Sequence, residues 1–265
     1  MKKLLLVGSL LAACSATAHE NQFNISNDNC SVSFQNDVRI SAKEVIVENQ
    51  ANQTMKISRD GYLHINGEQV KLSSEQQYAV AAYSQRLRQD LPQVADIALD
   101  AIKLAGVAID EVGQAFGLNS MSRLHDTMED LSVDIKNTFY QQDDFVMGEK
   151  TFNEFGENFE DKFEAQIEDA VKSTMMESIG NILVTLGSQM VSSGGDMEAF
   201  EARMEKLGQD IETKVEDQSK QIELRADKLC EQFSEIAAQE SALAAQIPQM
   251  SQYQLFTLKT KQSSI

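Results

Sequence analysis

Hydrophobic residues recur at spacings of three and four over residues 73–247, which is the period of an amphipathic helix. The first such stripe covers residues 83–116 and contains Pro92, which should divide it into two helices because proline lacks a backbone N–H. A serine followed three residues later by a glutamine predicts a capping box at its start. The candidate residues for this box are Ser73, Ser74, Gln76 and Gln77.

The same spacing of hydrophobic residues predicts three further helices. One covers residues 121–139 and should be capped by Asn119 or Ser120. The next covers residues 152–190, and the last begins at a cap on Asp196 and stops at Pro248. Phenylalanines on the stripe of residues 152–190 should be buried together against the last helix, namely Phe152, Phe155, Phe159 and Phe163.

Residues 30–72 have a different pattern, in which short runs of β-branched and aromatic residues are separated by turn signals. Asp60-Gly61 and Asn66-Gly67 supply the positive φ that tight hairpins require. This segment therefore predicts a small antiparallel β unit of four to six strands, too small to be stable unless it packs on the helices.

The predicted fold class is α+β, mostly helical, with a small N-terminal antiparallel β unit packed on a bundle of long helices. The predicted division of the chain is a signal peptide (1–18), a flexible segment (19–29), the β unit (30–72), the helical bundle (73–247) and a flexible tail (248–265).

The start of the chain has the pattern of an export signal. Lys2 and Lys3 precede an uncharged, apolar run over residues 4–13, and Ala16-Thr17-Ala18 supplies the small residues of a cleavage site. Cleavage after Ala18 is favoured, which predicts a periplasmic protein. An alternative is left open: residues 11–14 resemble a lipobox, in which Cys14 would carry a lipid and anchor the protein to a membrane facing the periplasm.

The charge and composition of the chain limit the classes of partner that the protein can bind. The chain has a net charge of −18, and loss of Lys2 and Lys3 leaves 41 acidic against 21 basic residues, a net charge of −20. Such a charge repels nucleic acid and anionic lipid. Outside the signal, no run of 18 residues is apolar enough to predict a membrane span.

Three cysteines are present: Cys14, Cys30 and Cys230. Cleavage removes Cys14 and lipidation would modify it, so two thiols remain in an oxidising compartment in either case. The simplest outcome is one disulfide between Cys30 and Cys230. Closing so long a loop is worth roughly 5 kcal/mol in the chain-entropy treatment.

Motifs for catalysis and cofactor binding are not found. The sequence has no Gly-x-Ser-x-Gly, Walker A, Cys-x-x-Cys or calcium-loop pattern, and its histidines His19, His64 and His125 follow no metal-ligand spacing. We therefore predict no catalytic residue, no metal site and no cofactor, and enzyme activity is not expected.

Residues 178–195 carry no charge, and Gly180, Gly187 and Gly194 stand seven residues apart on one helical face. The favoured interpretation is close packing against another helix, since a residue without Cβ lets backbones approach. A face for a ligand or a membrane is the alternative.

Several of these features together resemble the YggN-like proteins of proteobacteria over roughly residues 30–235. They are Cys30-Ser31-Val32, Asp37-Val38, Asp60-Gly61, Asn66-Gly67, Leu91-Pro92 and the late Cys230. The resemblance implies an exported protein of uncharacterised function and supports the pairing of the two cysteines.

Two functional hypotheses follow. The first is a non-enzymatic envelope protein that acts as a binding, chaperone-like or scaffold protein, with another envelope protein as its partner; association with a second copy of the chain is also left open. The second is a small-ligand carrier or hydrolase with a site between the β unit and the helices.

Overall fold

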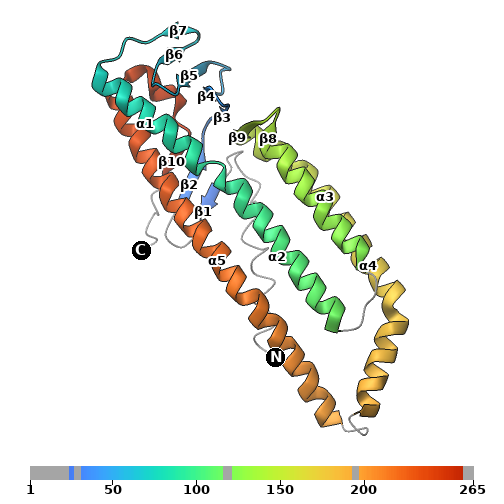
Figure 1. The fold of residues 1–265 in the computed structure, drawn as a ribbon. Coiled ribbons are helices and arrows are strands. Elements are labelled where there is room, and N and C mark those ends of the chain that lie inside the picture. Colours follow the sequence, from blue (N-terminus) through green and yellow to red (C-terminus); the bar gives the residue numbers. More distant parts are fainter. Residues whose placement is uncertain (1–23, 27–30, 116–120, 193–196, 259–265) are drawn as a thin grey trace, which may run out of the picture.

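The fold of the chain is an α+β arrangement of antiparallel sheets and long helices, seen here in a computed structural model that describes residues 24–26, 31–115, 121–192 and 197–258. The helices are α1 (Ser74–Asp90), α2 (Gln93–Ala115), α3 (Ser122–Phe139), α4 (Glu149–Ser192) and α5 (Met197–Gln246). Helices α1 and α2 follow one another along α5, and α4 lies along α3. The molecule is therefore elongated (Figure 1).

Local signals place the boundaries of the first two helices as expected. Ser73 caps α1, its side chain accepting a hydrogen bond from the Gln76 N–H while Gln76 Oε1 accepts one from the Ser73 N–H. The break at Pro92 is confirmed, because α1 ends at Asp90 and α2 begins at Gln93. The expected cap on α3 is wrong: its N-cap is Met121, which makes no side-chain capping bond.

Two antiparallel sheets form among the described residues. The larger has seven strands in the order β7-β6-β5-β4-β3-β9-β8, and the smaller has three in the order β1-β2-β10. Their bounds are β1 (Asn24–Ser26), β2 (Ser31–Phe34), β3 (Asp37–Ile40), β4 (Glu44–Glu48), β5 (Thr54–Ser58), β6 (Leu63–Ile65), β7 (Glu68–Gln69), β8 (Tyr140–Gln141), β9 (Asp144–Met147) and β10 (Phe256–Leu258).

The hairpin turns have the backbone that their residues predict. Asn66 and Gly67 both have positive φ, of 50° and 86°, as in a two-residue hairpin. Gly61 has φ 78°, and a Cβ there would lie 2.2 Å from the carbonyl oxygen of Gln77 in α1. Gly61 thus lets the sheet approach the helix.

The sheets also contain strands from outside the predicted β unit. The break in the helical pattern near residues 141–144 is the turn of a β8–β9 hairpin, whose second strand pairs with β3. Asn24–Ser26, expected in a flexible segment, pairs with β2.

The expectation of a flexible tail is wrong over residues 248–258. Pro248–Tyr253 forms a 3-10 helix, η3, and β10 pairs with β2. Tyr253, Leu255 and Phe256 are buried, because their side chains complete the core.

The core lies where the sheets meet α1 and the second half of α5. Alternating positions of β3, β4 and β5 are buried, and these side chains pack with apolar residues of the helices. Rings of Phe34, Phe233 and Phe256 have centroids 4.8–6.0 Å apart. Aromatic contacts of this kind join the first strands, α5 and the last strand.

The structure tests the expected burial of the α4 phenylalanines at one position, Phe152. The Phe152 ring lies 5.4 Å from that of Phe34 and 5.7 Å from that of Phe139, between centroids, so it packs on β2 and α3. The side chains of Phe155, Phe159 and Phe163 lie outside the described residues.

Candidate functional site

A buried carboxylate joins three distant parts of the chain. Glu240 of α5 is 3% exposed, and its Oε1 accepts hydrogen bonds from the hydroxyl of Tyr83 in α1 at 2.6 Å and from the Leu255 N–H at 2.9 Å. Its Oε2 accepts one from the Phe256 N–H at 3.1 Å. The side chain therefore ties α1, α5 and the start of β10 together.

Burial raises the pKa of Glu240 to about 7, although the hydrogen bonds from Tyr83 and the two backbone N–H groups oppose the rise. Burial also raises the pKa of Tyr83, followed by the charge of Glu240. A carboxyl that titrates near neutrality suits general acid–base catalysis. Here, however, it lies in the apolar core, and the hydrogen bonds it accepts hold protein segments together.

Glu240 is not among the residues that the sequence patterns above singled out, although the chain carries a signal for it. The apolar stripe of α5 passes from Ile236 to Leu243, and Glu240 occupies the helical position between them that faces the core. A charged residue in the middle of a buried stripe predicts a partnered carboxylate.

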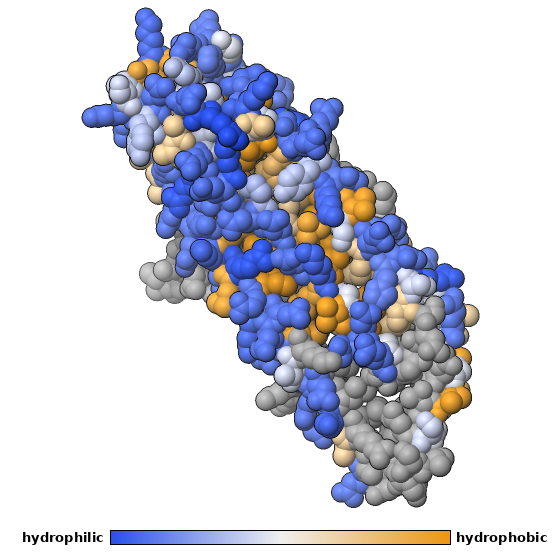
Figure 2. Space-filling view, viewed as in Figure 1, coloured by the Kyte–Doolittle hydropathy of each residue, from blue (hydrophilic) through white to orange (hydrophobic). Residues whose placement is uncertain are grey.

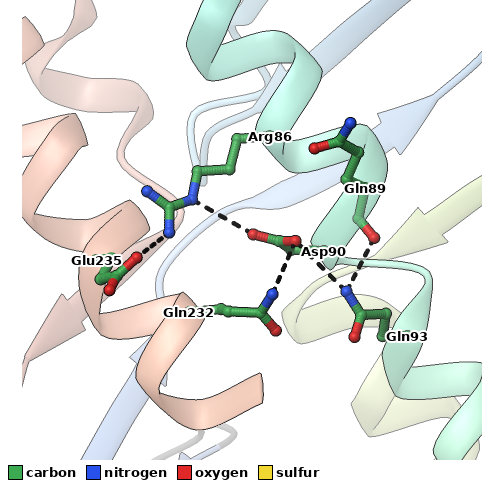
Figure 3. Close-up of polar contacts among 6 residues, drawn as sticks. All are labelled: Arg86, Gln89, Asp90, Gln93, Gln232 and Glu235. Carbon is green, nitrogen blue, oxygen red and sulfur yellow. Dashed lines mark hydrogen bonds and ion pairs between the residues drawn. The ribbon is translucent and has the colours of Figure 1, made fainter. Parts of the chain in front are cut away.

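A second polar network lies at the junction of α1 and α2 (Figure 3). Asp90, which is 6% exposed, accepts from Arg86 Nε at 3.4 Å and from Gln93 Nε2 at 3.4 Å. Gln232 Nε2 of α5 donates to the same carboxylate at 3.2 Å, and Arg86 also pairs with Glu235 of α5. Burial lowers the pKa of Arg86, but its bonds to Glu235 and Asp90 outweigh burial and raise that pKa overall.

This network does not resemble a catalytic centre. Its members are a guanidinium, two carboxylates and side-chain amides, with no nucleophile beside a base. Because Asp90 ends α1 and Gln93 begins α2, the network instead fixes the break at Pro92 against α5.

The histidines are not brought together. His125 of α3 pairs with Asp110 of α2 at 2.9 Å, and both side chains are about half exposed. His64 lies opposite Lys56 in the sheet, and His19 lies outside the described residues. Within the described part of the chain, no group of three or more His, Cys, Asp or Glu residues could hold a metal ion.

The cysteine prediction falls partly outside the described residues, which include Cys230 and neither Cys14 nor Cys30. Cys230 is 1% exposed on α5. Strand β2 begins at Ser31 and packs on α5, where the rings of Phe34 and Phe233 are 6.0 Å apart. The pairing of Cys30 with Cys230 remains a prediction.

The middle of α4 exposes several large apolar side chains among those that the structure describes. Six of them are 41–71% exposed: Val171, Met175, Met176, Ile179, Leu183 and Val184. At about 100° per residue these six positions cover more than half of the helix circumference. We call this exposed surface, with Gly180 and Gly187, the α4 apolar face. Hydrophobic residues reach the surface along the outer edge of α4 in Figure 2.

The same stretch of α4 buries small residues instead. Ala170, Thr174 and Ser178 are 2–5% exposed, on the side that packs on α3. Arg123 of α3 fixes this contact, since it pairs with Glu177 at 3.2 Å and donates to Ser173 Oγ at 3.2 Å. Among the side chains that the structure describes in this stretch, these small residues are buried and six large apolar residues are exposed, whereas an ordinary amphipathic helix buries its large apolar residues.

The expected close packing at the glycines is wrong for Gly180 and Gly187. A Cβ added at either would meet no atom of the described chain within 4 Å. Helix α4 packs on α3 through Ala170, Thr174 and Ser178, so its glycines face away from the neighbouring helix. Gly194 lies outside the described residues.

Comparison with known protein families shows which family the chain belongs to. Residues 30–256 match the family described as protein of unknown function (DUF2884). The chain belongs to this family. Proteins named uncharacterized protein YggN, from Escherichia coli K12 and O157:H7, are 30% identical to it over 112 residues, or 42% of this chain.

The YggN match covers 44% of the length of those proteins, less than half. The DUF2884 match includes the whole seven-stranded sheet and every helix from α1 to α5. No solved structure matches the chain. In the described part of this DUF2884 protein, no helix is both long and apolar enough to cross a bilayer.

Proposed function

We propose that this DUF2884 protein is an exported, non-enzymatic protein of the periplasm that binds protein through the α4 apolar face. The observation that carries the proposal is the pattern of burial among the described side chains of α4, where six large apolar residues are 41–71% exposed while Ala170, Thr174 and Ser178 are buried. Soluble monomers rarely expose a contiguous apolar patch above a few hundred Å², and larger ones mark interaction sites.

The polar sites support a non-catalytic role. Glu240 and Asp90, the two buried carboxylates with the most partners described, each connect separate helices through hydrogen bonds. A carrier or hydrolase site between the β unit and the helices was the alternative. Where the three-stranded sheet meets α5, the rings of Phe34, Phe233 and Phe256 pack against one another. Aromatic packing of this kind leaves little room for a ligand.

Export and the disulfide belong to the same proposal. Lys2, Lys3 and the apolar run before Ala18 support export, and the mature charge of −20 suits a protein that avoids anionic lipid. A Cys30–Cys230 bond would fix the start of β2 to α5. Anchoring through Cys14 is the competing route.

Site-specific photocrosslinking in cells tests the binding role. A photoreactive residue at Leu183, which is 66% exposed on α4, should give a protein adduct of defined mass. The matched control is Leu224 on α5, an equally large side chain that is 61% exposed. Adducts absent at 183, or equally abundant at 224, would refute a specific surface on α4.

A further inference from the structure

We propose that Arg88 and Arg59 bind a phosphate group at one end of the seven-stranded sheet, where the β3–β4 and β5–β6 turns meet α1. The site is built from α1 and the sheet, so the inference goes beyond the proposed function and does not depend on the α4 apolar face. It follows from one unused edge of a guanidinium group, a second guanidinium beside it and the hydrogen bonds that fix both turns.

The Arg88 guanidinium has two hydrogen-bond donors that the protein does not use. Its Nη1 donates to the carbonyl oxygen of Ser41 in the β3–β4 turn. Its Nε and Nη2 are shielded from solvent and have no hydrogen-bond partner among the described residues. These two nitrogens form one edge of the guanidinium, whose parallel N–H groups can bind two oxygens of one oxyanion. A buried donor without a partner costs free energy, and an oxyanion on this edge would remove that cost.

Arg88 also differs from other arginines of the chain in having no acidic partner. Burial lowers the pKa of Arg88, and the charge of Arg59 lowers it further, but an arginine stays charged at neutral pH. Arg88 forms no ion pair with a described residue, although the chain has 41 acidic residues. Four other arginines do pair with carboxylates, namely Arg39, Arg86, Arg123 and Arg225. A partly buried charge is normally paired, so a bound anion is the expected partner of Arg88.

Arg59 supplies a second positive charge at the same place. It stands in the β5–β6 turn, its side chain is exposed, and its charge acts on Arg88. Two guanidinium groups repel each other, and an anion bound between them replaces this repulsion with attraction to both. A phosphate group carries a charge of about −1.5 to −2 at neutral pH, which matches two arginines better than the single charge of a carboxylate does.

Hydrogen bonds fix the two turns that carry the site. In the β3–β4 turn, the Glu44 N–H donates to Ser41 Oγ at 3.1 Å. In the β5–β6 turn, Gln77 Nε2 of α1 donates at 2.8 Å to the carbonyl oxygen of Asp60, the residue after Arg59. Groups that are held in place before binding lose less conformational freedom when the ligand arrives.

The site can be reached from the surface. Arg88 is only partly buried and Arg59 is exposed, so a phosphate would enter beside Arg59 as exposed side chains of the turns move aside. The net charge of −18 repels phosphate from most of the protein. Phosphate that binds should therefore occupy one local pair of positive charges and not many weak sites.

Isothermal titration of the full mature chain with inorganic phosphate, at constant ionic strength, tests the site. One phosphate per chain should bind with a Kd of about 1 mM or lower. Arg88→Met should weaken binding by about 10-fold or more, because it removes both donors of the free edge, and Arg59→Met should weaken it by about threefold or more. Arg225→Met is the matched control: it removes another arginine, 44% exposed on α5, and should leave the Kd within about twofold.

Two further measurements keep the test independent of folding. Circular dichroism shows whether each variant is folded, and Arg59→Met should fold because Arg59 is exposed. It therefore decides the question even if loss of the bond from Arg88 to Ser41 unfolds Arg88→Met. Arg88→Lys keeps the charge and loses the paired donors, so its affinity should lie between those of the wild type and Arg88→Met.

Two more anions identify the ligand. Glycerol 3-phosphate binding at least as tightly as inorganic phosphate would indicate a phosphate carried on a larger molecule, and weaker binding would indicate the free ion. Acetate, with a single charge, should bind about 10-fold or more weakly than phosphate. The proposal is overturned if phosphate does not bind at about 20 mM, if Arg88→Met and Arg59→Met bind it as the wild type does, or if acetate binds as tightly.

Discussion

Glu240 makes the stability of this protein depend on pH in a direction opposite to that of most paired carboxylates. Its pKa is raised in the folded protein to about 7, from the ordinary 4.5, because burial penalises its charge. The folded state therefore holds this proton more tightly than the unfolded state. The resulting stability is fully present below pH 4.5 and is lost as pH rises through about 7.

The magnitude follows from the two pKa values. A difference between 4.5 and about 7 corresponds to about 3 kcal/mol of unfolding free energy. Glu240→Gln has no proton to bind, so the stability of wild type relative to this variant should fall by about 3 kcal/mol between about pH 4.5 and about pH 8. Taking the difference between the two proteins cancels the titration of the other groups.

The assay is urea unfolding of both proteins at several pH values, followed by circular dichroism. The control is Glu231→Gln, which changes an exposed glutamate of the same helix and should stay within about 0.5 kcal/mol of wild type throughout. A wild-type minus Glu240→Gln difference that varies by less than about 1 kcal/mol over this range would refute the reasoning. It would mean that the hydrogen bonds from Tyr83 and the backbone offset the effect of burial on the pKa of Glu240.

Three further predictions concern the core, the disulfide and export. Phe256→Ala should lower the free energy of unfolding by about 3–5 kcal/mol, because its buried ring contacts two other rings; thermal unfolding checks this, and a loss below about 1 kcal/mol would contradict a structured C-terminal segment. Serine at both Cys30 and Cys230 should cost about 2–5 kcal/mol, and two reactive thiols in unfolded, unreduced wild type would exclude the bond. The intact mass of the exported protein should correspond to a chain starting at His19, whereas a diacylglycerol on Cys14 would show the lipoprotein route.

Local sequence signals determined much of the fold. The capping box at Ser73, the break at Pro92 and the turn at Asn66-Gly67 are each specified within a few residues, so the sequence predicted them. The long α4 and the helical content follow from hydrophobic period in the same way. Membership in a family of unknown function also followed from short motifs, and the DUF2884 match confirms it.

Local sequence signals could not predict which strands pair when they lie far apart in the chain. β9 joins the sheet beside β3, over 100 residues away, and β10 pairs with β2 across more than 220. A short apolar run such as residues 253–256 has no local feature that tells a strand from a tail. Its buried state depends on the surface that β2, α5 and Glu240 provide.

The α4 apolar face shows the same limit most clearly. The sequence determined that residues 178–195 are uncharged and that their glycines share one side of a helix. It did not determine which side packs inward, because a helix with small residues on one side and large apolar residues on another can bury either. The tertiary structure decided this: α3 contacts the side of Ala170, Thr174 and Ser178, and six large apolar side chains of the described part of α4 are left exposed.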